Sequence, residues 1–286
     1  MPEDLQQFDI KEQYIESQFS QVGSIIEIKG KGKLVSVHRA NQNAFYGKEG
    51  DPIHENDALY TLDDCRVRIE FKDKNTVIMA PDTHLDVDKV YESIFKGKKS
   101  ALFRMTRGKA IFYALRLFRY PEMSFELKTP TATVGVRGTK FGTEIESTKE
   151  GRSQVLNRMF AGRSLRSAQM DAGKQNTITR VYGIEGEVHV TSLIDGRVQR
   201  LQENEILEAD LKGLGTVKVD TERVMTFIQD VISGMVSPPP RIEPKVLERD
   251  FRREDLDRME KMDDIKLRER EHPPIIHDQR GGGSGS

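Results

Sequence analysis

The sequence has few of the residues that build redox or metal chemistry. It contains one cysteine, Cys65, and no tryptophan among 286 residues. A single cysteine excludes an intramolecular disulfide and any zinc site built on several thiolates. Cys65 stands at the start of a predicted strand, DDCRVRIEF, where a small buried apolar residue is favoured over a reactive thiol. The cysteine content therefore does not indicate a redox compartment.

The chain also lacks a long apolar run and an excess of either charge. No stretch approaches the ~18 to 20 apolar residues that span a bilayer. The N-terminus, MPEDLQQFDI, has neither the basic nor the apolar region of a signal peptide. We expect a native signal peptide to have been removed, because GGGSGS at 281–286 is typical of an engineered linker. The formal net charge of −1 argues against a uniformly basic nucleic-acid binder.

Recognisable catalytic motifs are absent as well. The six histidines are scattered, and no serine stands in the glycine-flanked turn of a nucleophile elbow. No glycine pattern follows a strand and opens a helix, as a phosphate-binding loop requires. We therefore predict that the protein is not an enzyme and that it uses no cofactor.

What the chain does contain is a long series of short strand patterns. Residues 66–71, RVRIEF, alternate strictly between polar and apolar, and DKN at 73–75 reads as a turn before a returning strand. Such turn signals recur about every ten residues. We predict a mainly β body over 22–220, built of stacked short antiparallel strands as a solenoid or a sandwich. A polar stretch at 147–176 predicts a long loop or insertion within it.

Helical spacing of apolar residues occurs at both ends of this β body. We predict an amphipathic helix within residues 1–21, on the spacing of Leu5, Phe8, Tyr14, Ile15 and Phe19. A second helix is predicted over 221–236, with Thr221 as its N-cap.

Beyond that helix the composition changes to a tail. Residues 237–243 are Pro-rich and predict a stiff linker. Residues 244–280 predict a charged helical tail, because acidic residues stand four positions before basic ones. We expect the 244–271 helix to contact a protein partner or a second copy of the chain, with a merely solvated tail as the alternative.

The most distinctive stretch is 125–145, FELKTPTATVGVRGTKFGTEI, in which two strand-like flanks enclose a glycine-rich centre. Pro130 removes a ladder donor, and Gly135 and Gly138 permit a bend or a bulge. We predict a corner between paired strands. Arg137 could grip a carboxylate ligand, but a structural clamp is favoured. The predicted structural motif comprises Pro130, Gly135, Arg137, Gly138 and Thr139.

The order of these patterns resembles the FecR domain family, called after the ferric-citrate regulator of iron uptake in Gram-negative bacteria. The segments that carry the resemblance are VGSI at 22–25, NDALYT at 56–61, VRIEFKD at 67–73, RGKA at 107–110, KTPTATVGVRGTKF at 128–141 and GIEGEV at 183–188. Together they cover roughly 22–210. Asn56 departs from the glycine that the family places there.

The resemblance implies an all-β extracytoplasmic domain without known chemistry, in the periplasm or at the cell surface. The regulators of this family carry a cytoplasmic anti-sigma segment and a membrane helix ahead of the domain, and this sequence shows neither. We predict a non-enzymatic scaffold or assembly subunit that acts through protein–protein contacts. The alternative is a signal-sensing regulatory module of a cell-surface signalling system.

A basic stretch between positions 96 and 119 carries no acidic residue and interleaves with aromatic residues. This pattern suits an anionic partner: the acidic tail of a neighbouring subunit, an anionic cell-surface polymer or, less favoured for a nearly neutral chain, single-stranded nucleic acid. The basic residues are Lys96, Lys98, Lys99, Arg104, Arg107, Lys109, Arg116 and Arg119.

An acidic row forms the other charged pattern. Asp82, Asp86 and Asp88, with His84, fall at every second position and would share one face of a strand. Such a row could bind a divalent cation. The solvated face of an edge strand gives the same pattern and is favoured, so we predict no metal site, with the three aspartates as weak candidates.

Overall fold

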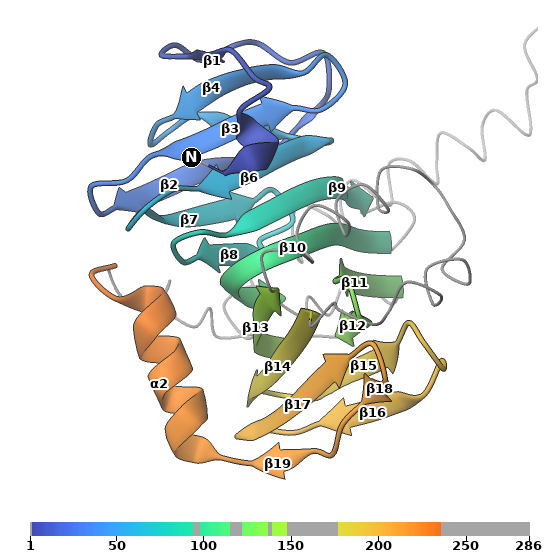
Figure 1. The fold of residues 1–286 in the computed structure, drawn as a ribbon. Coiled ribbons are helices and arrows are strands. Elements are labelled where there is room, and N and C mark those ends of the chain that lie inside the picture. Colours follow the sequence, from blue (N-terminus) through green and yellow to red (C-terminus); the bar gives the residue numbers. More distant parts are fainter. Residues whose placement is uncertain (1, 94–97, 115–121, 137–138, 148–176, 236–286) are drawn as a thin grey trace, which may run out of the picture. The chain divides into compact units, whose positions relative to one another are not determined.

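The sequence folds into successive short strands followed by one helix in a computed structural model that describes residues 2–93, 98–114, 122–136, 139–147 and 177–235 (Figure 1). Residues up to Val236 form one compact unit, and a second unit, Ser237–Ser286, lies outside the described residues. The predicted linker and charged tail fall in that second unit. The predicted loop at 147–176 also lies outside the described residues, apart from Ser147, which ends a strand.

The elements follow the chain in this order. They are η1 (Glu3–Leu5), β1 (Ile10–Lys11), β2 (Gln21–Lys29), β3 (Leu34–His38), β4 (Asn43–Gly47), β5 (Pro52–His54), β6 (Asp57–Thr61), β7 (Arg66–Phe71), β8 (Thr76–Met79), β9 (His84–Ser93), β10 (Lys98–Ala114), β11 (Glu122–Lys128), β12 (Ala132–Val136), β13 (Thr139–Ser147), β14 (Thr177–Glu185), β15 (Val188–Ser192), β16 (Val198–Leu201), β17 (Glu205–Asp210), β18 (Gly213–Leu214), β19 (Lys218–Val219) and α2 (Thr221–Ile232). The prediction of a mainly β protein is confirmed.

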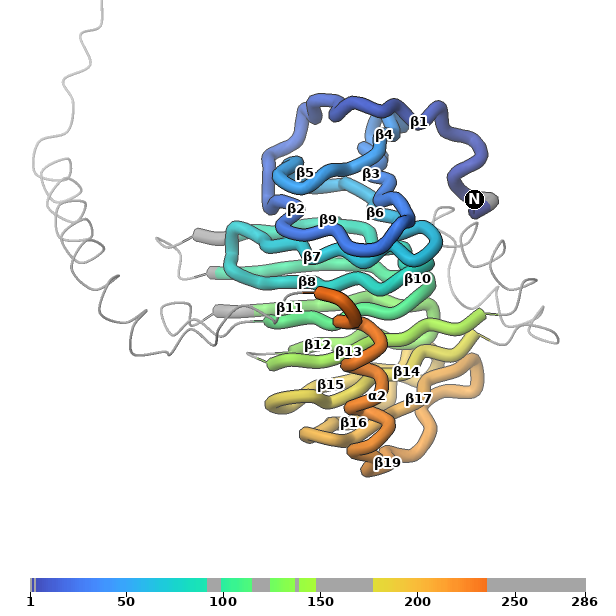
Figure 2. Tube along the Cα trace, turned by 90° about the vertical axis from the view of Figure 1, so that its left-hand side faces the viewer, coloured from blue at the N-terminus to red at the C-terminus, as the bar shows by residue number. Residues whose placement is uncertain are grey.

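Hydrogen bonding joins the described strands into one 19-stranded sheet, which β10 divides into two halves. Sheet A runs β1–β4–β3–β6–β9–β10–β11–β12–β15–β16. Sheet B runs β5–β2–β7–β8–β10–β13–β14–β17, and β17 also pairs with β18 and β19. Strands of both halves are stacked along the body in approximate chain order (Figure 2).

Strand β10 belongs to both halves because the chain turns at Gly108. Up to Arg107 it pairs with β9 in sheet A, and from Gly108 it pairs with β13 in sheet B. Gly108 has a φ of 88°, and a Cβ there would stand 2.4 Å from the hydroxyl of Thr83. The next residue, Lys109, receives a 3.0 Å hydrogen bond from the Thr83 hydroxyl and donates its own N–H to the same oxygen. Glycine is therefore required at the passage between the halves.

The main core lies between sheet A and sheet B. Its buried side chains come from both halves, for example Leu59 and Phe103 from sheet A, and Ile69 and Phe141 from sheet B. Phenylalanine rings form its centre, and Phe112 stacks on Phe141 with ring centroids 5.0 Å apart. Each buried ring of this kind contributes about 1.5 to 3 kcal/mol relative to an exposed one.

The predicted N-terminal helix within residues 1–21 is wrong. The segment forms the short turn η1 and then β1, which pairs in parallel with β4. Leu5 is fully buried, and Phe8 and Ile10 pack on the same small core, formed by β3, β4 and β6. The helix does not form because the edge of sheet A offers hydrogen-bond partners to the backbone of this segment. Its apolar side chains contact several strands rather than lining one face of a helix.

The predicted C-terminal helix is confirmed, but its cap is not Thr221. Helix α2 begins at Thr221, and the preceding Asp220 is the N-cap, whose carboxylate accepts a 2.9 Å hydrogen bond from the backbone N–H of Arg223. An aspartate in extended conformation one residue earlier satisfies a free N–H of the first turn, which a residue inside the helix cannot do. The helix crosses sheet B along β8, β10, β14 and β17 (Figure 2).

Candidate functional site

Helix α2 packs on sheet B through one apolar face. Val224, Phe227 and Val231 are its buried residues. The ring of Phe227 stacks on Tyr182 of β14, with centroids 4.1 Å apart and planes 11° apart. Gly142 of β13 lies beneath this ring, where a Cβ would stand 2.1 Å from Phe227 Cε1. The missing side chain of Gly142 thus lets the helix approach the sheet.

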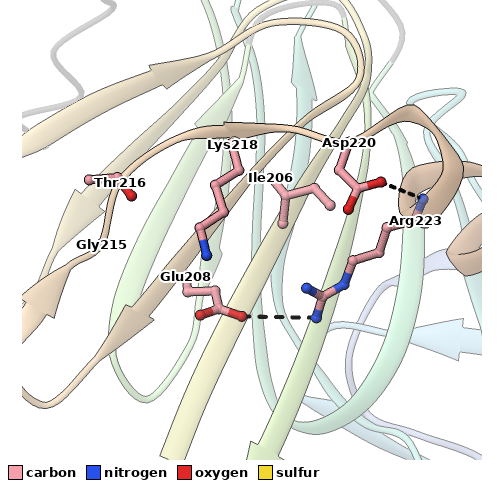
Figure 3. Close-up of a pocket in the computed structure, with 7 residues that line it drawn as sticks. All are labelled: Ile206, Glu208, Gly215, Thr216, Lys218, Asp220 and Arg223. Carbon is pink, nitrogen blue, oxygen red and sulfur yellow. Dashed lines mark hydrogen bonds and ion pairs between the residues drawn. The ribbon is translucent and has the colours of Figure 1, made fainter.

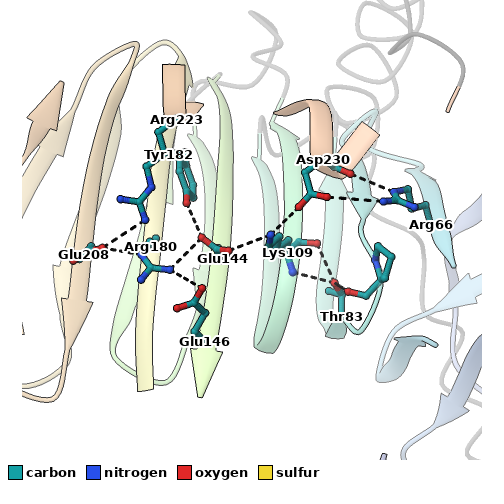
Figure 4. A network of polar contacts seen from close by, with 11 residues as sticks. Arg66, Thr83, Lys109, Glu144, Glu146, Arg180, Tyr182, Glu208, Arg223 and Asp230 are labelled. Atoms are coloured by element: carbon teal, nitrogen blue, oxygen red, sulfur yellow. Dashed lines mark hydrogen bonds and ion pairs between the residues drawn. The ribbon is translucent and has the colours of Figure 1, made fainter. Parts of the chain in front are cut away.

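The second half of α2 is also held by charge. Asp230 accepts a hydrogen bond from Lys109 Nζ at 2.7 Å, and its backbone carbonyl accepts one from Arg66 Nε at 3.3 Å (Figure 4). Lys109 Nζ also lies 3.3 Å from Glu144 Oε1 of β13. Burial alone would lower the pKa of Lys109, but Asp230 and Glu144 outweigh burial and raise it. These contacts connect α2 to β7, β10 and β13.

The same polar network continues toward the start of α2. The hydroxyl of Tyr182 donates to Glu144 at 2.6 Å, and Arg180 donates to Glu208 at 2.7 Å (Figure 4). Arg223 of α2 lies 3.9 Å from the same Glu208 oxygen. Burial alone would raise the pKa of Glu144, but the hydroxyl of Tyr182 and two neighbouring cations lower it. We call this chain of contacts, from Arg66 to Arg223, the α2 network.

A small cavity of about 170 Å³ lies beside the start of α2. Asp220 and Arg223 border it, and the Glu208–Arg223 pair crosses its wall (Figure 3). Small-molecule sites usually enclose about 300 to 1,000 Å³. Because the cavity is smaller and its Glu208 and Arg223 pair with each other, its geometry does not favour a small-molecule ligand. The lining residues are Ile206, Glu208, Gly215, Thr216, Lys218, Asp220 and Arg223.

Only part of the acidic row predicted at 82–88 lies on one strand. His84, Asp86 and Asp88 lie on β9, whereas Asp82 is exposed in the preceding turn with a φ of 54°. The edge-strand interpretation is wrong, because β9 pairs with β6 on one side and β10 on the other. Both edges of β9 are therefore paired within sheet A.

Arginines occupy the position that a cation would take beside this row. Arg39 and Arg104 each donate to Asp88, at 2.7 and 2.8 Å. Both also lie 3.6 Å from the same oxygen of the buried Asp86. Two planar guanidinium groups thus satisfy two carboxylates, which leaves a metal ion no unpaired oxygen donors at this position.

The described side chains of the basic stretch contact polar or acidic groups of the same chain. Lys99 is buried and donates to Asn75 at 3.0 Å, and Arg107 contacts both oxygens of Asp4 at 3.0 Å. Arg104 and Lys109 hold the acids described above. Lys96, Arg116 and Arg119 lie outside the described residues, as does the side chain of Lys98. An anionic-partner surface stays a prediction for those four.

No pattern in the sequence predicted the acidic partners of Arg107 and Lys109. Asp4 and Arg107 are 103 positions apart, and Lys109 and Asp230 are 121 positions apart. No local spacing rule connects residues at such separations, since side-chain pair rules apply within a helix or between adjacent strands.

Within the distinctive stretch at 125–145, the chain passes from sheet A to sheet B. Strand β12 belongs to sheet A and β13 to sheet B, and Pro130 lies in the turn that precedes β12. Gly135 lies inside β12, paired with Glu126 on β11. Arg137 and Gly138 lie outside the described residues, so the structural clamp stays a prediction.

Cys65 behaves as the sequence predicts. Its side chain is fully buried, and burial raises the pKa of its thiol to about 12. A thiol with so high a pKa carries almost no thiolate near neutral pH and is a poor nucleophile.

Comparison with known families adds one decisive observation. Residues 57–157 match the model of the family described as FecR protein. This part of the chain is similar to FecR proteins. In the structure this match begins at β6 and takes in every strand through β13, including the passage at Gly108. Helix α2 contacts β8 and β10 of the FecR region and also β14 and β17, which follow it.

Two solved structures resemble this chain more weakly. Both are crystal structures of one candidate anti-sigma factor from Parabacteroides distasonis ATCC 8503, at 1.65 and 2.50 Å resolution. Each has a TM-score of 0.42 and 17% identity, over 60% of this chain and 64% of that chain. The chain thus spans less than two thirds of that protein. No curated protein matches the sequence.

The described residues contain two helical elements, η1 and α2, that can be compared with a membrane-spanning helix. Neither η1 nor α2 has the length and apolar character that a membrane-spanning helix requires.

Proposed function

We propose that this chain is a signal-sensing regulatory module of a cell-envelope signalling system, located outside the cytoplasm. The supporting observation is the FecR match over residues 57–157, because the proteins of that family are regulatory. Regulation by this family implies a protein partner rather than a substrate. The second candidate function is the scaffold or assembly subunit, which rests on the charged tail alone.

The position of α2 supports a regulatory role. The helix packs on strands inside and outside the FecR region, and the chain continues from it into residues 236–286. A partner that changed the packing of α2 would therefore act on the FecR region and on the tail through one element. Its charged contacts are partly exposed, so they can exchange with water at little cost.

Catalysis has little support among the described residues. The buried acids beside α2 and on β9 are held by arginine, lysine or tyrosine, which fixes them as structural ions. Cys65 is buried with a raised pKa. We therefore propose a non-enzymatic protein that acts by binding other proteins, including a second copy of itself through residues 244–271.

Transcript profiling separates the two candidate functions. In the source bacterium, deletion of the gene should change a small, defined set of transcripts, and the natural full-length gene should restore them. A scaffold predicts instead the loss of an assembly without a defined transcriptional response. An unchanged transcript profile under all tested envelope stresses would rule out the regulatory proposal.

Cell fractionation tests the location. The natural full-length protein should accumulate outside the cytoplasm, and its β body should be cleaved by protease added to cells with permeabilised outer membranes. Full protection until the inner membrane is broken would contradict the proposed location.

A further inference from the structure

Two histidines and one aspartate meet in the interior near the start of the body, away from α2. His38 ends β3, His54 ends β5 and Asp57 begins β6. The sheet register places His38 directly opposite Asp57. Asn56, with a φ of 66°, forms the tight turn that returns His54 to the same place. All three side chains are more than nine-tenths buried.

The hydrogen bonds of His38 define which of its nitrogens carries a proton. Its Nε2 lies 2.7 Å from the carbonyl oxygen of Ile15, which can only accept, so Nε2 must donate. Its Nδ1 lies 2.7 Å from Asp57 Oδ1, which as a carboxylate also accepts. In a neutral ring the Nδ1 lone pair would face that carboxylate. A positive centre is therefore required at this point: a proton on Nδ1, or a metal ion between the two groups.

His54 supplies the observation that favours a metal ion. Its Nδ1 is buried and has no hydrogen-bond partner, although it lies 3.5 Å from Asp57 Oδ2. A proton on His38 does not satisfy this atom. A buried nitrogen without a partner is unfavourable, whereas a metal ion would bind it.

We propose that His38, His54 and Asp57 form a site for a divalent transition-metal ion of the Zn²⁺ class. One donor atom from each residue lies within 4.8 Å of the other two. A tetrahedral ion with bonds of about 2.0 to 2.2 Å separates its ligands by roughly 3.3 to 3.6 Å. The 3.5 Å between His54 Nδ1 and Asp57 Oδ2 lies within this range. The 2.7 Å hydrogen bond between His38 and Asp57 must open by roughly 0.6 to 0.9 Å to admit the ion, which side-chain rotation can provide.

The groups around the three ligands are arranged as in metal sites. The bond from His38 Nε2 to Ile15 fixes the ring with Nδ1 toward the site. The backbone N–H of His54 donates to Asp57 Oδ2 at 2.7 Å and holds the carboxylate. Tyr14 covers His54 with its ring at 6.4 Å. Since Ile15 and Tyr14 come from the segment before β2, the bound ion would also fix that segment to the body.

The test uses the full chain after treatment with a chelator, with Zn²⁺ and Co²⁺ as probes. Calorimetric titration should show one Zn²⁺ bound per chain, and the melting temperature should rise with the free Zn²⁺ concentration. Co²⁺ should give the visible absorption of a tetrahedral complex. Absence of both a calorimetric signal and a melting shift would overturn the proposal and leave a protonated His38–Asp57 ion pair as the explanation.

The discriminating variant is His54→Phe, which keeps a ring beside Tyr14 but removes the unpartnered nitrogen. Without metal it should be at least as stable as the wild type, while its Zn²⁺ affinity should fall at least about tenfold. His54→Gln is the second variant, in case the larger ring prevents folding. His189→Phe, at an exposed histidine on β15, is the matched control and should bind Zn²⁺ as the wild type does. Equal binding by His54→Phe and the wild type would overturn the proposal.

Discussion

Two glycines on consecutive strands of the chain, β12 and β13, differ in what surrounds them. Gly142 lies under the Phe227 ring, where an added Cβ would meet the ring at 2.1 Å, whereas Gly135 on β12 has no atom within 4 Å of that position. Both are paired within their strands. The same residue type thus has a packing role at one position and no steric role at the other.

Replacing each glycine with alanine tests this difference. Gly142→Ala should destabilise the protein by roughly 1 to 3 kcal/mol, because α2 must move away from the sheet. Gly135→Ala is the matched control and should leave stability unchanged or slightly raised. Urea denaturation measures both. Equal losses for the two variants would contradict the close contact of α2 with β13.

Asp86 shows how single residues set the pH dependence of stability. Burial alone would raise the pKa of Asp86, but His84, Arg39 and Arg104 outweigh burial and hold the pKa below its usual range. The folded state therefore binds this proton more weakly than the unfolded state. The resulting stabilisation is complete above the ordinary aspartate pKa of about 3.9 and is lost as pH falls through the lower, folded-state pKa.

Asp86→Asn should therefore cost about 3 kcal/mol at pH 7, since it leaves part of a buried charge cluster uncompensated. The difference from the wild type should shrink as pH falls from about 4 through the lower folded-state pKa of Asp86, where the wild-type carboxyl also becomes neutral. Urea denaturation at both pH values measures the change. If the difference in stability between the two proteins does not depend on pH, Asp86 contributes through its packing and not through its charge.

At the scale of elements, α2 is attached to sheet B by apolar packing and by ion pairs. The expected free-energy contribution of each shows which matters more. Phe227 is 5% exposed and stacked on Tyr182. Lys109 and Asp230 form one of the two 2.7 Å ion pairs of the described α2 network, and their side chains are 37% and 45% exposed. Exposed pairs contribute about 0 to 1 kcal/mol, and a buried aromatic several times more. The packing of Phe227 should therefore decide whether α2 stays on the sheet.

Phe227→Ala should cost roughly 3 to 5 kcal/mol for the docked state of α2 and expose residues 220–235 to protease. Asp230→Asn, on the next turn of the same helix, should cost about 1 kcal/mol or less. Limited proteolysis and hydrogen exchange of α2 measure both. If the two variants release the helix equally, charge rather than packing attaches it.

At the scale of the whole molecule, the body is a unit that does not include the tail. Residues 1–236 form one compact unit, and β10 connects its two sheet halves through a shared core. Residues 237–286 form a separate unit, so the body should not need them to fold.

Deleting residues 237–286 should leave the melting temperature of the body within about 2 °C, because the core described for the body is built from residues of the first unit. If the tail mediates self-association, the mass in solution should fall by a whole-number factor. Light scattering with size-exclusion chromatography measures this mass. An unchanged mass would remove self-association through 244–271, and a collapsed melting transition would contradict the independence of the body.

The sequence by itself determined the strands and the final helix of this protein. Alternation in residues 66–71 predicted β7, and the spacing of Val224, Phe227 and Val231 predicted α2, because these patterns depend on neighbours along the chain. The FecR motifs identified the family for the same reason, since they are local strings of residues.

Only the tertiary structure decided how these elements are used. It turned residues 1–21 into a sheet edge and placed β9 between two strands. It paired Arg107 and Lys109 with acids 103 and 121 positions away in the sequence. It also brought His38, His54 and Asp57 together. Such outcomes depend on which strands pair across long loops, and local periodicity carries no information on that pairing.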